Sequence, residues 1–183
     1  MRNTICAMNI SIDGCYDHTR FNGDDELLDY FTDLMKDVDQ TVTGRKMYEL
    51  MVPHWPDIAK NQSGTKAANE YADTVSVIDT IVFSTTMEEF DGGPRILRGN
   101  LEAEVRKLKE QPGKKISIGG VSLRSQLIKL GLIDEFYFVI HPVLAGSGPR
   151  LLEGFDMDEI ERLELVDTKI LKSGCVALHY IKQ

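Results

Sequence analysis

The sequence predicts a three-layer α/β protein, in which a mostly parallel central sheet lies between two layers of helices. Apolar strand-like segments alternate with segments of helical periodicity through the first two-thirds of the chain, which indicates parallel strands joined by helices. Two of these strands run through glycine directly into a helix, at Gly44 and at Gly119-Gly120. Two final apolar segments flank Lys172-Ser173-Gly174, which indicates an antiparallel C-terminal hairpin.

The first third of the chain contains two strands and one helix. Apolar residues predict a strand over 5–12 that is buried on both faces and ends at Asp13-Gly14. Apolar residues recur at helical spacing over 27–38, behind the acidic residues 24–26, which favour a helix start. A strand over 41–43 follows and leads into Gly44.

The middle third begins with a predicted loop over 53–56, because the two prolines there oppose a continuing helix. We expect a short helix over 66–71. Extended structure is then expected over 75–77 and 80–83, ending at the hydroxyl residues Ser84, Thr85 and Thr86.

The last third begins with Asn100, which can cap a helix over 101–108. A strand around Ile116 leads into the glycine pair and a helix that ends before Gly131. The remaining expected elements are a long strand over 133–144 and hairpin strands over 163–171 and 175–181.

Composition limits the classes of protein that this chain can be. Its 183 residues, 42% hydrophobic and 27% charged, predict a single globular domain over residues 1–183. A net charge of −8 argues against a nucleic-acid partner. Three widely spaced cysteines without a C-x-x-C arrangement predict reduced thiols and no metal site. The N-terminal apolar segment is too short and polar to cross a membrane and lacks a signal sequence, so we expect a cytoplasmic protein with no membrane partner.

The glycine pair offers the strongest indication of a ligand. Glycine lets a ligand approach the main chain, and the amides and dipole of the following helix attract an anion such as a phosphate. The chain has neither G-x-G-x-x-G nor G-x-x-x-x-G-K-[ST], so the common nucleotide fingerprints are absent. On these residues alone, a simple turn between strand and helix remains the alternative.

The order of these segments resembles the dihydrofolate reductase superfamily. Within it the chain is most similar to the branch that includes the C-terminal reductase domain of bacterial riboflavin-biosynthesis deaminase/reductases. The resemblance covers nearly the whole chain and therefore implies a dihydrofolate reductase-like fold. It rests on Ser11-Ile12-Asp13-Gly14, Gly44-Arg45-Lys46-Met47-Tyr48-Glu49, His54-Trp55-Pro56, Ile118-Gly119-Gly120, and the stretch from Ile133-Asp134-Glu135 to Pro142-Val143-Leu144-Ala145-Gly146-Ser147-Gly148.

The resemblance implies NADPH as the cofactor and assigns residues to it. Gly44 and Arg45 would lie near the phosphates, and three hydroxyl residues would lie beside the adenosine 2′-phosphate. A guanidinium together with hydroxyls suits such a compact dianion. The cofactor-binding residues implied are Gly44, Arg45, Ser84, Thr85, Thr86, Gly119, Gly120, Val121, Ser122 and Leu123.

The resemblance also implies a substrate cleft. Reduction of a C=N bond needs a proton from a side chain or a water molecule, and the catalytic candidates are Asp13 and Asp25. Folate reductases carry a carboxylate where this chain has Leu27, and riboflavin-pathway reductases commonly carry a glutamate where it has Ile118. The substrate-binding candidates are Gly14, Trp55, Pro142, Leu144, Gly146 and Gly148.

The expected function is an NADPH-dependent reductase of a pyrimidine- or pterin-like small molecule. The nearest named activity is reduction of 5-amino-6-(5-phosphoribosylamino)uracil in riboflavin biosynthesis. Dihydrofolate reduction is the enzymatic alternative, and a non-catalytic NADPH-binding regulatory protein is the alternative from another class. We also expect a homodimer, with the aromatic residues Phe136 to Phe138 and the C-terminal hairpin as its surface.

Overall fold

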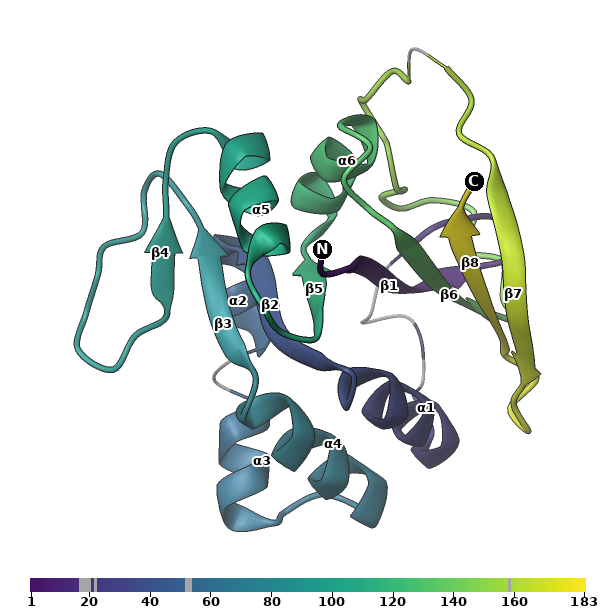
Figure 1. Ribbon diagram of the computed structural model, residues 1–183. Helices are drawn as coiled ribbons and strands as arrows, with labels where there is room; N and C mark the ends of the chain where they lie inside the picture. The colour runs from purple at the N-terminus through teal and green to yellow at the C-terminus, as the bar shows by residue number, and fades with distance from the viewer. Residues whose placement is uncertain (17–20, 22, 52–53, 158) are drawn as a thin grey trace.

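A computed structural model describes residues 1–16, 21, 23–51, 54–157 and 159–183, which build one eight-stranded sheet covered by helices (Figure 1). The strand order is β4-β3-β2-β5-β1-β6-β8-β7. The six strands from β4 to β6 in this order are parallel, whereas β8 pairs antiparallel with both β6 and β7. The predicted mostly parallel sheet with an antiparallel C-terminal hairpin is confirmed. The strands are β1 (Thr4–Ser11), β2 (Val38–Gly44), β3 (Asp79–Phe83), β4 (Arg95–Leu97), β5 (Lys115–Gly119), β6 (Glu135–His141), β7 (Leu163–Ile170) and β8 (Val176–Lys182).

Helices lie on both faces of the sheet and complete the three layers (Figure 1). Helices α5 (Leu101–Glu110) and α6 (Val121–Lys129) cover one face, and α1 (Asp25–Met35) covers the other. Helix α4 (Lys66–Ser76) packs beside α1, and α3 (Trp55–Asn61) packs on α4. The short α2 (Arg45–Met51) follows β2 without a loop.

The central strands are buried from both sides, which explains why apolar residues of the same strand pack on both faces of the sheet. Ile116 and Ile118 of β5 pack under α5 and α6 together with Val105 and Leu127. On the opposite face, Leu27 of α1 packs against β6 and β8. Each such fully buried side chain contributes about 1.5–3 kcal/mol, so this core holds the strand ends in a constant arrangement.

The predicted helix over 27–38 ends earlier than expected. Asp24 caps α1 by accepting a hydrogen bond from the Leu27 amide at 2.8 Å, as the acidic start suggested, but the helix ends at Met35. Val38 is the first residue of β2, where its side chain is buried beside Ile5. Its apolar character therefore reflects the sheet core and not the helix face.

Two further predictions in the middle of the chain are wrong. We expected a loop at Trp55-Pro56, but α3 begins there, because a proline in the first turn lacks only an amide that has no helical partner; Pro53 lies outside the described residues. We expected extended structure over 75–77, but α4 continues to Ser76. Packing of α4 against α1 and α3 outweighs the strand preference of Val75 and Val77.

The fold offers one of the two surfaces predicted for a homodimer, the C-terminal hairpin, but not the other, the aromatic residues of β6. Phe136 and Phe138 lie on β6 inside the sheet, where both pack into the core beneath α6. They therefore cannot supply a partner surface, and that part of the prediction is wrong. The edge strand β7 instead carries the exposed apolar side chains of Leu165, Val166 and Ile170.

Candidate active site

The segments singled out by the sequence gather at one edge of the sheet. Asp13-Gly14 follows β1, Gly44 ends β2, Ser84 follows β3, and Gly119 ends β5. Because these strands are parallel neighbours, their carboxyl ends meet at the same edge. This is the edge where ligands collect in sheets of this kind.

Three glycines lie together where β2 and β5 end. Thr43 pairs with Gly119 across the two strands, so Gly44 and Gly120 lie side by side. Gly120 has φ +85°, and a Cβ atom there would come within 3.5 Å of the Gly44 amide nitrogen. A Cβ on Gly44 would meet nothing within 4 Å, so this glycine borders open space.

The first turn of α6 begins directly after these glycines. Gly120 is the N-cap residue and supplies no side-chain hydrogen bond to the turn. The side chains of Val121 and Leu123 pack into the core, and Ser122 Oγ accepts a bond from Gln126 at 3.3 Å. These three residues can therefore offer an anion their amides and the helix dipole, and Ser122 adds a hydroxyl that is exposed and still able to donate.

A basic and hydroxyl-rich corner lies beside the glycines. Arg45 donates from Nε to Glu49 at 2.6 Å and from Nη1 to Thr86 Oγ1 at 3.3 Å. Ser84 is buried, and its Oγ accepts hydrogen bonds from the amides of Thr86 and Met87. The structure thus brings the predicted cation and hydroxyls together, with Thr86 in contact with Arg45 and with the exposed Thr85 beside it.

Arg98 is a cation near this corner that the sequence analysis missed. It follows the short strand β4, and its Nη2 donates to the Met87 carbonyl at 2.6 Å. The pairing of Ser84 with Leu97 brings Arg98 to the same loop. No strand was expected over 95–97, so nothing in the sequence placed this residue at the edge.

Asp13 joins the loop after β1 to the loop after β6. Its carboxylate accepts hydrogen bonds from Ser11 Oγ at 2.6 Å and from the amides of Ala145 and Gly146 at 2.9 and 2.8 Å. The bond from Ser11 and then those two amides hold the pKa of Asp13 well below its ordinary value. A carboxylate so stabilised does not donate a proton near neutral pH, so we assign Asp13 the role of a link between the loops.

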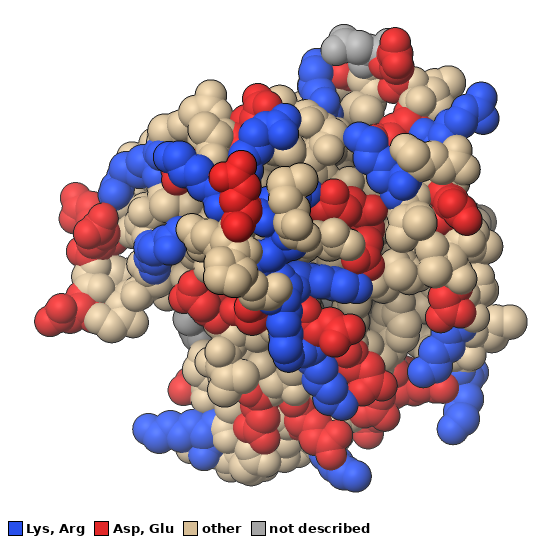
Figure 2. All heavy atoms as spheres, in the orientation of Figure 1, with Lys and Arg blue, Asp and Glu red and all other residues tan. Residues whose placement is uncertain are grey.

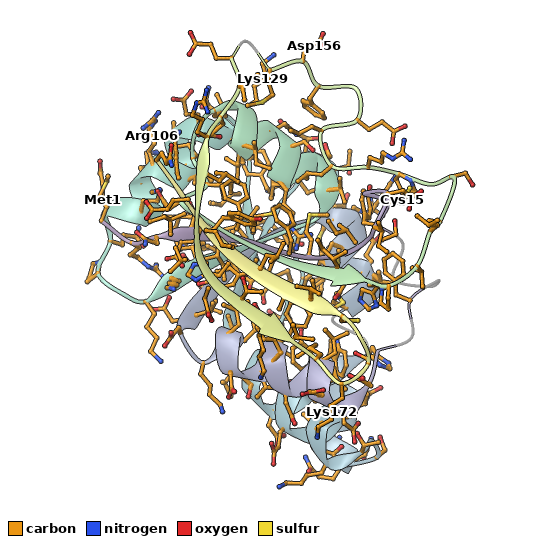
Figure 3. All side chains as sticks on the ribbon, turned by 90° about the vertical axis from the view of Figure 1, so that its right-hand side faces the viewer. Met1, Cys15, Arg106, Lys129, Asp156 and Lys172 are labelled. Atoms are coloured by element: carbon orange, nitrogen blue, oxygen red, sulfur yellow. The ribbon has the colours of Figure 1, made fainter. Side chains whose placement is uncertain are left out.

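Further contacts make these two loops a single unit. Ile12 donates its amide to Val143, and Cys15 forms an isolated antiparallel bridge with Arg150. Cys15 marks this end of the sheet in Figure 3, far from Met1 at the other end. The predicted substrate residues of this unit lie at its surface: Gly14, half-buried with φ +79°, and the exposed Pro142, Leu144, Gly146 and Gly148.

Asp25 and Trp55 have their described contacts elsewhere. Asp25 is exposed in the first turn of α1, where it accepts a hydrogen bond from Thr65 Oγ1 at 2.7 Å and lines a hollow between α1 and α4. Trp55 packs edge-on against Tyr71 of α4, with ring centroids 4.7 Å apart, and thereby anchors α3. The structure does not bring either residue to the glycines, and their site roles stay predictions.

A polar row at the ends of β1 and β6 was also missed. His141 lies 3.1 Å from Asn9 Oδ1 through Nε2 and 3.4 Å from Cys175 Sγ through Nδ1. The three residues are far apart in the chain, so no local motif marks them. Only the pairing of β6 with β1 and β8 makes them neighbours.

Within the described part of the chain, no helix has the length and apolar character needed to cross a bilayer. The sequence matches the family described as RibD C-terminal domain over residues 2–178. It is 35% identical to the uncharacterized protein YyaP of Bacillus subtilis over 151 residues, which cover 82% of this chain and 77% of that protein.

Two solved structures show the same fold over the whole chain. One is the Thermotoga maritima diaminohydroxyphosphoribosylaminopyrimidine deaminase/5-amino-6-(5-phosphoribosylamino)uracil reductase, with a TM-score of 0.71 and 14% identity over 57% of its length. The other is dihydrofolate reductase from Enterococcus faecalis, complexed with NADP(H) and RAB-propyl, with a TM-score of 0.61 and 15% identity over 96% of its length. The expected dihydrofolate reductase-like fold is confirmed.

Proposed function

The chain belongs to the RibD C-terminal domain family, and on this premise we propose that it is an NADPH-dependent oxidoreductase. Its substrate is a pyrimidine- or pterin-like small molecule, and the nearest named activity is reduction of 5-amino-6-(5-phosphoribosylamino)uracil. The observation that carries the proposal is the continuous edge from the open glycines at β2 and β5 to the corner of Arg45 and Thr86. Amides, a cation and hydroxyls follow one another there in the order that a phosphorylated dinucleotide needs.

Each part of this edge has a distinct binding task. Gly44 and Gly120 leave room for phosphates against the main chain, and the first amides of α6 donate hydrogen bonds to them. Arg45, with Thr86 and Ser84, binds the 2′-phosphate that distinguishes NADPH from NADH. Bound there, the cofactor supplies the hydride.

The proton for the reduced nitrogen comes from water in this proposal. Asp13 stays ionised because of its three hydrogen bonds, and burial lowers the pKa of His141 despite the nearby charge of Asp24. Neither group is therefore a proton donor near neutral pH. The linked loops 12–16 and 142–150 serve to exclude bulk solvent around the substrate.

Titration of the protein with NADPH and with NADH tests the cofactor. We expect calorimetry to give tighter binding of NADPH, and Arg45→Ala to weaken NADPH binding about tenfold without changing NADH binding, because one charge-assisted contact is lost. Lys46→Ala removes the next cation in the chain, also exposed, and serves as the matched control. Equal affinity of the wild type for the two cofactors refutes the assignment.

Turnover distinguishes this function from its alternatives. We expect NADPH oxidation on addition of 5-amino-6-(5-phosphoribosylamino)uracil. NADPH oxidation with dihydrofolate but not with the uracil compound favours dihydrofolate reduction. The similarity of the fold to that of the Enterococcus faecalis enzyme also supports this alternative. Binding of NADPH without turnover of either compound favours a non-catalytic regulatory protein, which is supported by Leu27 and Ile118 standing where the related reductases carry carboxylates.

A homodimer remains part of the proposal, with the edge strand β7 of the predicted C-terminal hairpin as its surface. The exposed side chains of Leu165, Val166 and Ile170 lie on an edge strand that has one free side. Sedimentation at micromolar concentration tests it, and a monomer would overturn it.

A further inference from the structure

We propose that the side-chain amide of Asn9 donates a hydrogen bond to the substrate, and that His141 and Cys175 are positioning residues that hold this amide in place. The inference rests on the proposed reductase function and names the part of the substrate that the protein recognises. That part is a hydrogen-bond acceptor, such as the carbonyl oxygen of a pyrimidine or pterin ring.

The sheet register brings Asn9 and His141 to the same face. In the parallel pair of β1 and β6, Asn9 lies opposite Val139 and Ser11 lies opposite His141. Residues two apart on a strand share a face. This is the face covered by α1, because Val139 packs there against Leu27.

The contact between Asn9 Oδ1 and His141 Nε2 sets the direction of the hydrogen bonds in this row. Asn9 Oδ1 can only accept, so His141 Nε2, 3.1 Å away, must carry the ring proton and donate it. Nδ1 is then an acceptor, and the Cys175 thiol at 3.4 Å donates to it. The hydrogen bonds run in one direction, from the Cys175 thiol to the His141 imidazole and from there to Asn9 Oδ1. The amide nitrogen of Asn9 lies on the side away from His141.

Burial and stacking make this row rigid. His141 is 4% exposed and Cys175 is 3% exposed, so water does not compete for their hydrogen bonds. The Phe21 ring stacks on His141 with centroids 4.7 Å apart and an interplanar angle of 13°. An imidazole held at both nitrogens and on one ring face keeps its own orientation. It therefore holds the Asn9 amide in the orientation described above.

The Asn9 nitrogen is available to a ligand. Asn9 is half-buried, and its Nδ2 donates to none of the described residues. It is also not sealed inside the protein, because Trp55 Nε1 is the one fully buried side-chain nitrogen or oxygen without a partner in the described part of the chain. A fixed, accessible amide donor two residues before Ser11, and so next to the Asp13 loop, suits recognition of a ring carbonyl.

Two pairs of variants test the inference in the full-length protein, with 5-amino-6-(5-phosphoribosylamino)uracil as the substrate probe. Asn9→Asp keeps the shape but replaces the donor by an acceptor, and we expect kcat/KM to fall at least about tenfold while NADPH affinity changes less than about twofold. Cys175→Ala removes the thiol donor and should lower kcat/KM about threefold, whereas Cys175→Ser retains a donor and should restore it.

Each outcome decides the inference. If Asn9→Asp is folded and kcat/KM stays within twofold of the wild type, Asn9 does not contact the substrate. If Cys175→Ala and Cys175→Ser behave alike, the thiol does not position the amide; this pair also carries the test if Asn9→Asp does not fold. A wild type that binds NADPH but does not reduce the probe overturns the proposed activity and this inference together, which distinguishes that failure from the variant results.

Discussion

The two ends of the parallel strands differ in how their polar groups are satisfied. At the amino ends, charged side chains pair with one another: Arg2 with Asp39, Lys109 with Asp134, and Lys115 with Glu135. At the carboxyl ends, glycines, an uncapped helix start and the Asn9 amide leave main-chain and side-chain donors open. The protein itself completes the hydrogen bonds at one end, whereas the other end keeps donors for the cofactor and substrate that we propose.

Glu135 shows how thoroughly the amino end is satisfied. It accepts hydrogen bonds from Asn3 at 2.8 Å, Lys115 at 2.9 Å and Tyr137 at 2.6 Å, with His179 at 3.0 Å. Burial by itself raises the pKa of Glu135, but the bonds from Tyr137, Asn3 and Lys115 outweigh it and lower the pKa to about 2. Figure 2 shows basic and acidic side chains next to one another across the face seen in Figure 1.

The largest expected effect comes from a substitution that disrupts cofactor binding at the carboxyl ends of the strands and leaves the amino ends unchanged. Gly44→Val should abolish NADPH binding, because the branched side chain enters the space beside Gly120, where the fold has no atom within 4 Å of the new Cβ. Since nothing in the fold is displaced, the melting temperature should stay near that of the wild type. Calorimetry with NADPH and thermal unfolding of the same sample check both parts.

Gly120→Val is the informative contrast to Gly44→Val. Gly120 has φ +85°, a conformation that a β-branched residue avoids, so a valine there would strain the backbone although its Cβ meets Gly44 and Met47 only in ordinary contact. We therefore expect this variant to lose stability as well as binding. Full NADPH affinity in folded Gly44→Val would place the cofactor elsewhere.

The next largest effect is expected from a substitution that disrupts the ion pairs at the amino ends of the strands and leaves the carboxyl ends unchanged. Glu135→Gln should lower the free energy of unfolding by about 2 kcal/mol, because the carboxylate is buried and its partner Lys115 loses its counter-charge. Binding of NADPH should not change. Chemical denaturation measures the loss, and Glu164→Gln, an exposed glutamate on β7, is the matched control and should have no effect.

The same residue predicts a pH dependence with a defined sign. The pKa of Glu135 is lower in the folded state, about 2, than its ordinary 4.5, so its contribution to stability is present above pH 4.5 and is lost as the pH falls toward 2. The wild type should lose unfolding free energy over this interval more steeply than Glu135→Gln. Parallel slopes for the two proteins would show that Glu135 is not stabilised by its partners.

The smallest expected effect concerns the link between the loops. Asp13→Asn keeps one acceptor oxygen but loses the charge that binds the amides of Ala145 and Gly146, so the KM for the uracil substrate should rise about threefold. NADPH affinity should stay close to the wild-type value. Asp156→Asn changes an exposed acid beyond the linked loops (Figure 3) and should leave KM unaltered.

Local patterns predicted the layers, the hairpin and the glycine segments, because each depends on neighbours in the chain. They failed where packing between distant elements decided the outcome. Trp55 and Pro56 begin a helix that only α4 stabilises, and Val75 continues α4 because of α1 and α3. Arg98 was missed for a similar reason, since the three residues of β4 form a strand only by pairing with β3.

The sequence by itself determined that parallel strands would end in glycine and hydroxyl residues on one edge, because periodicity and glycine positions are local properties. Only the tertiary structure decided which side chains meet there. Asp13 links two loops because it accepts hydrogen bonds from amides 132 and 133 residues away. Asn9 of β1, His141 of β6 and Cys175, which directly precedes β8, form a row for the same reason. Strand register sets such contacts, and register depends on the packing of the whole sheet and its helices.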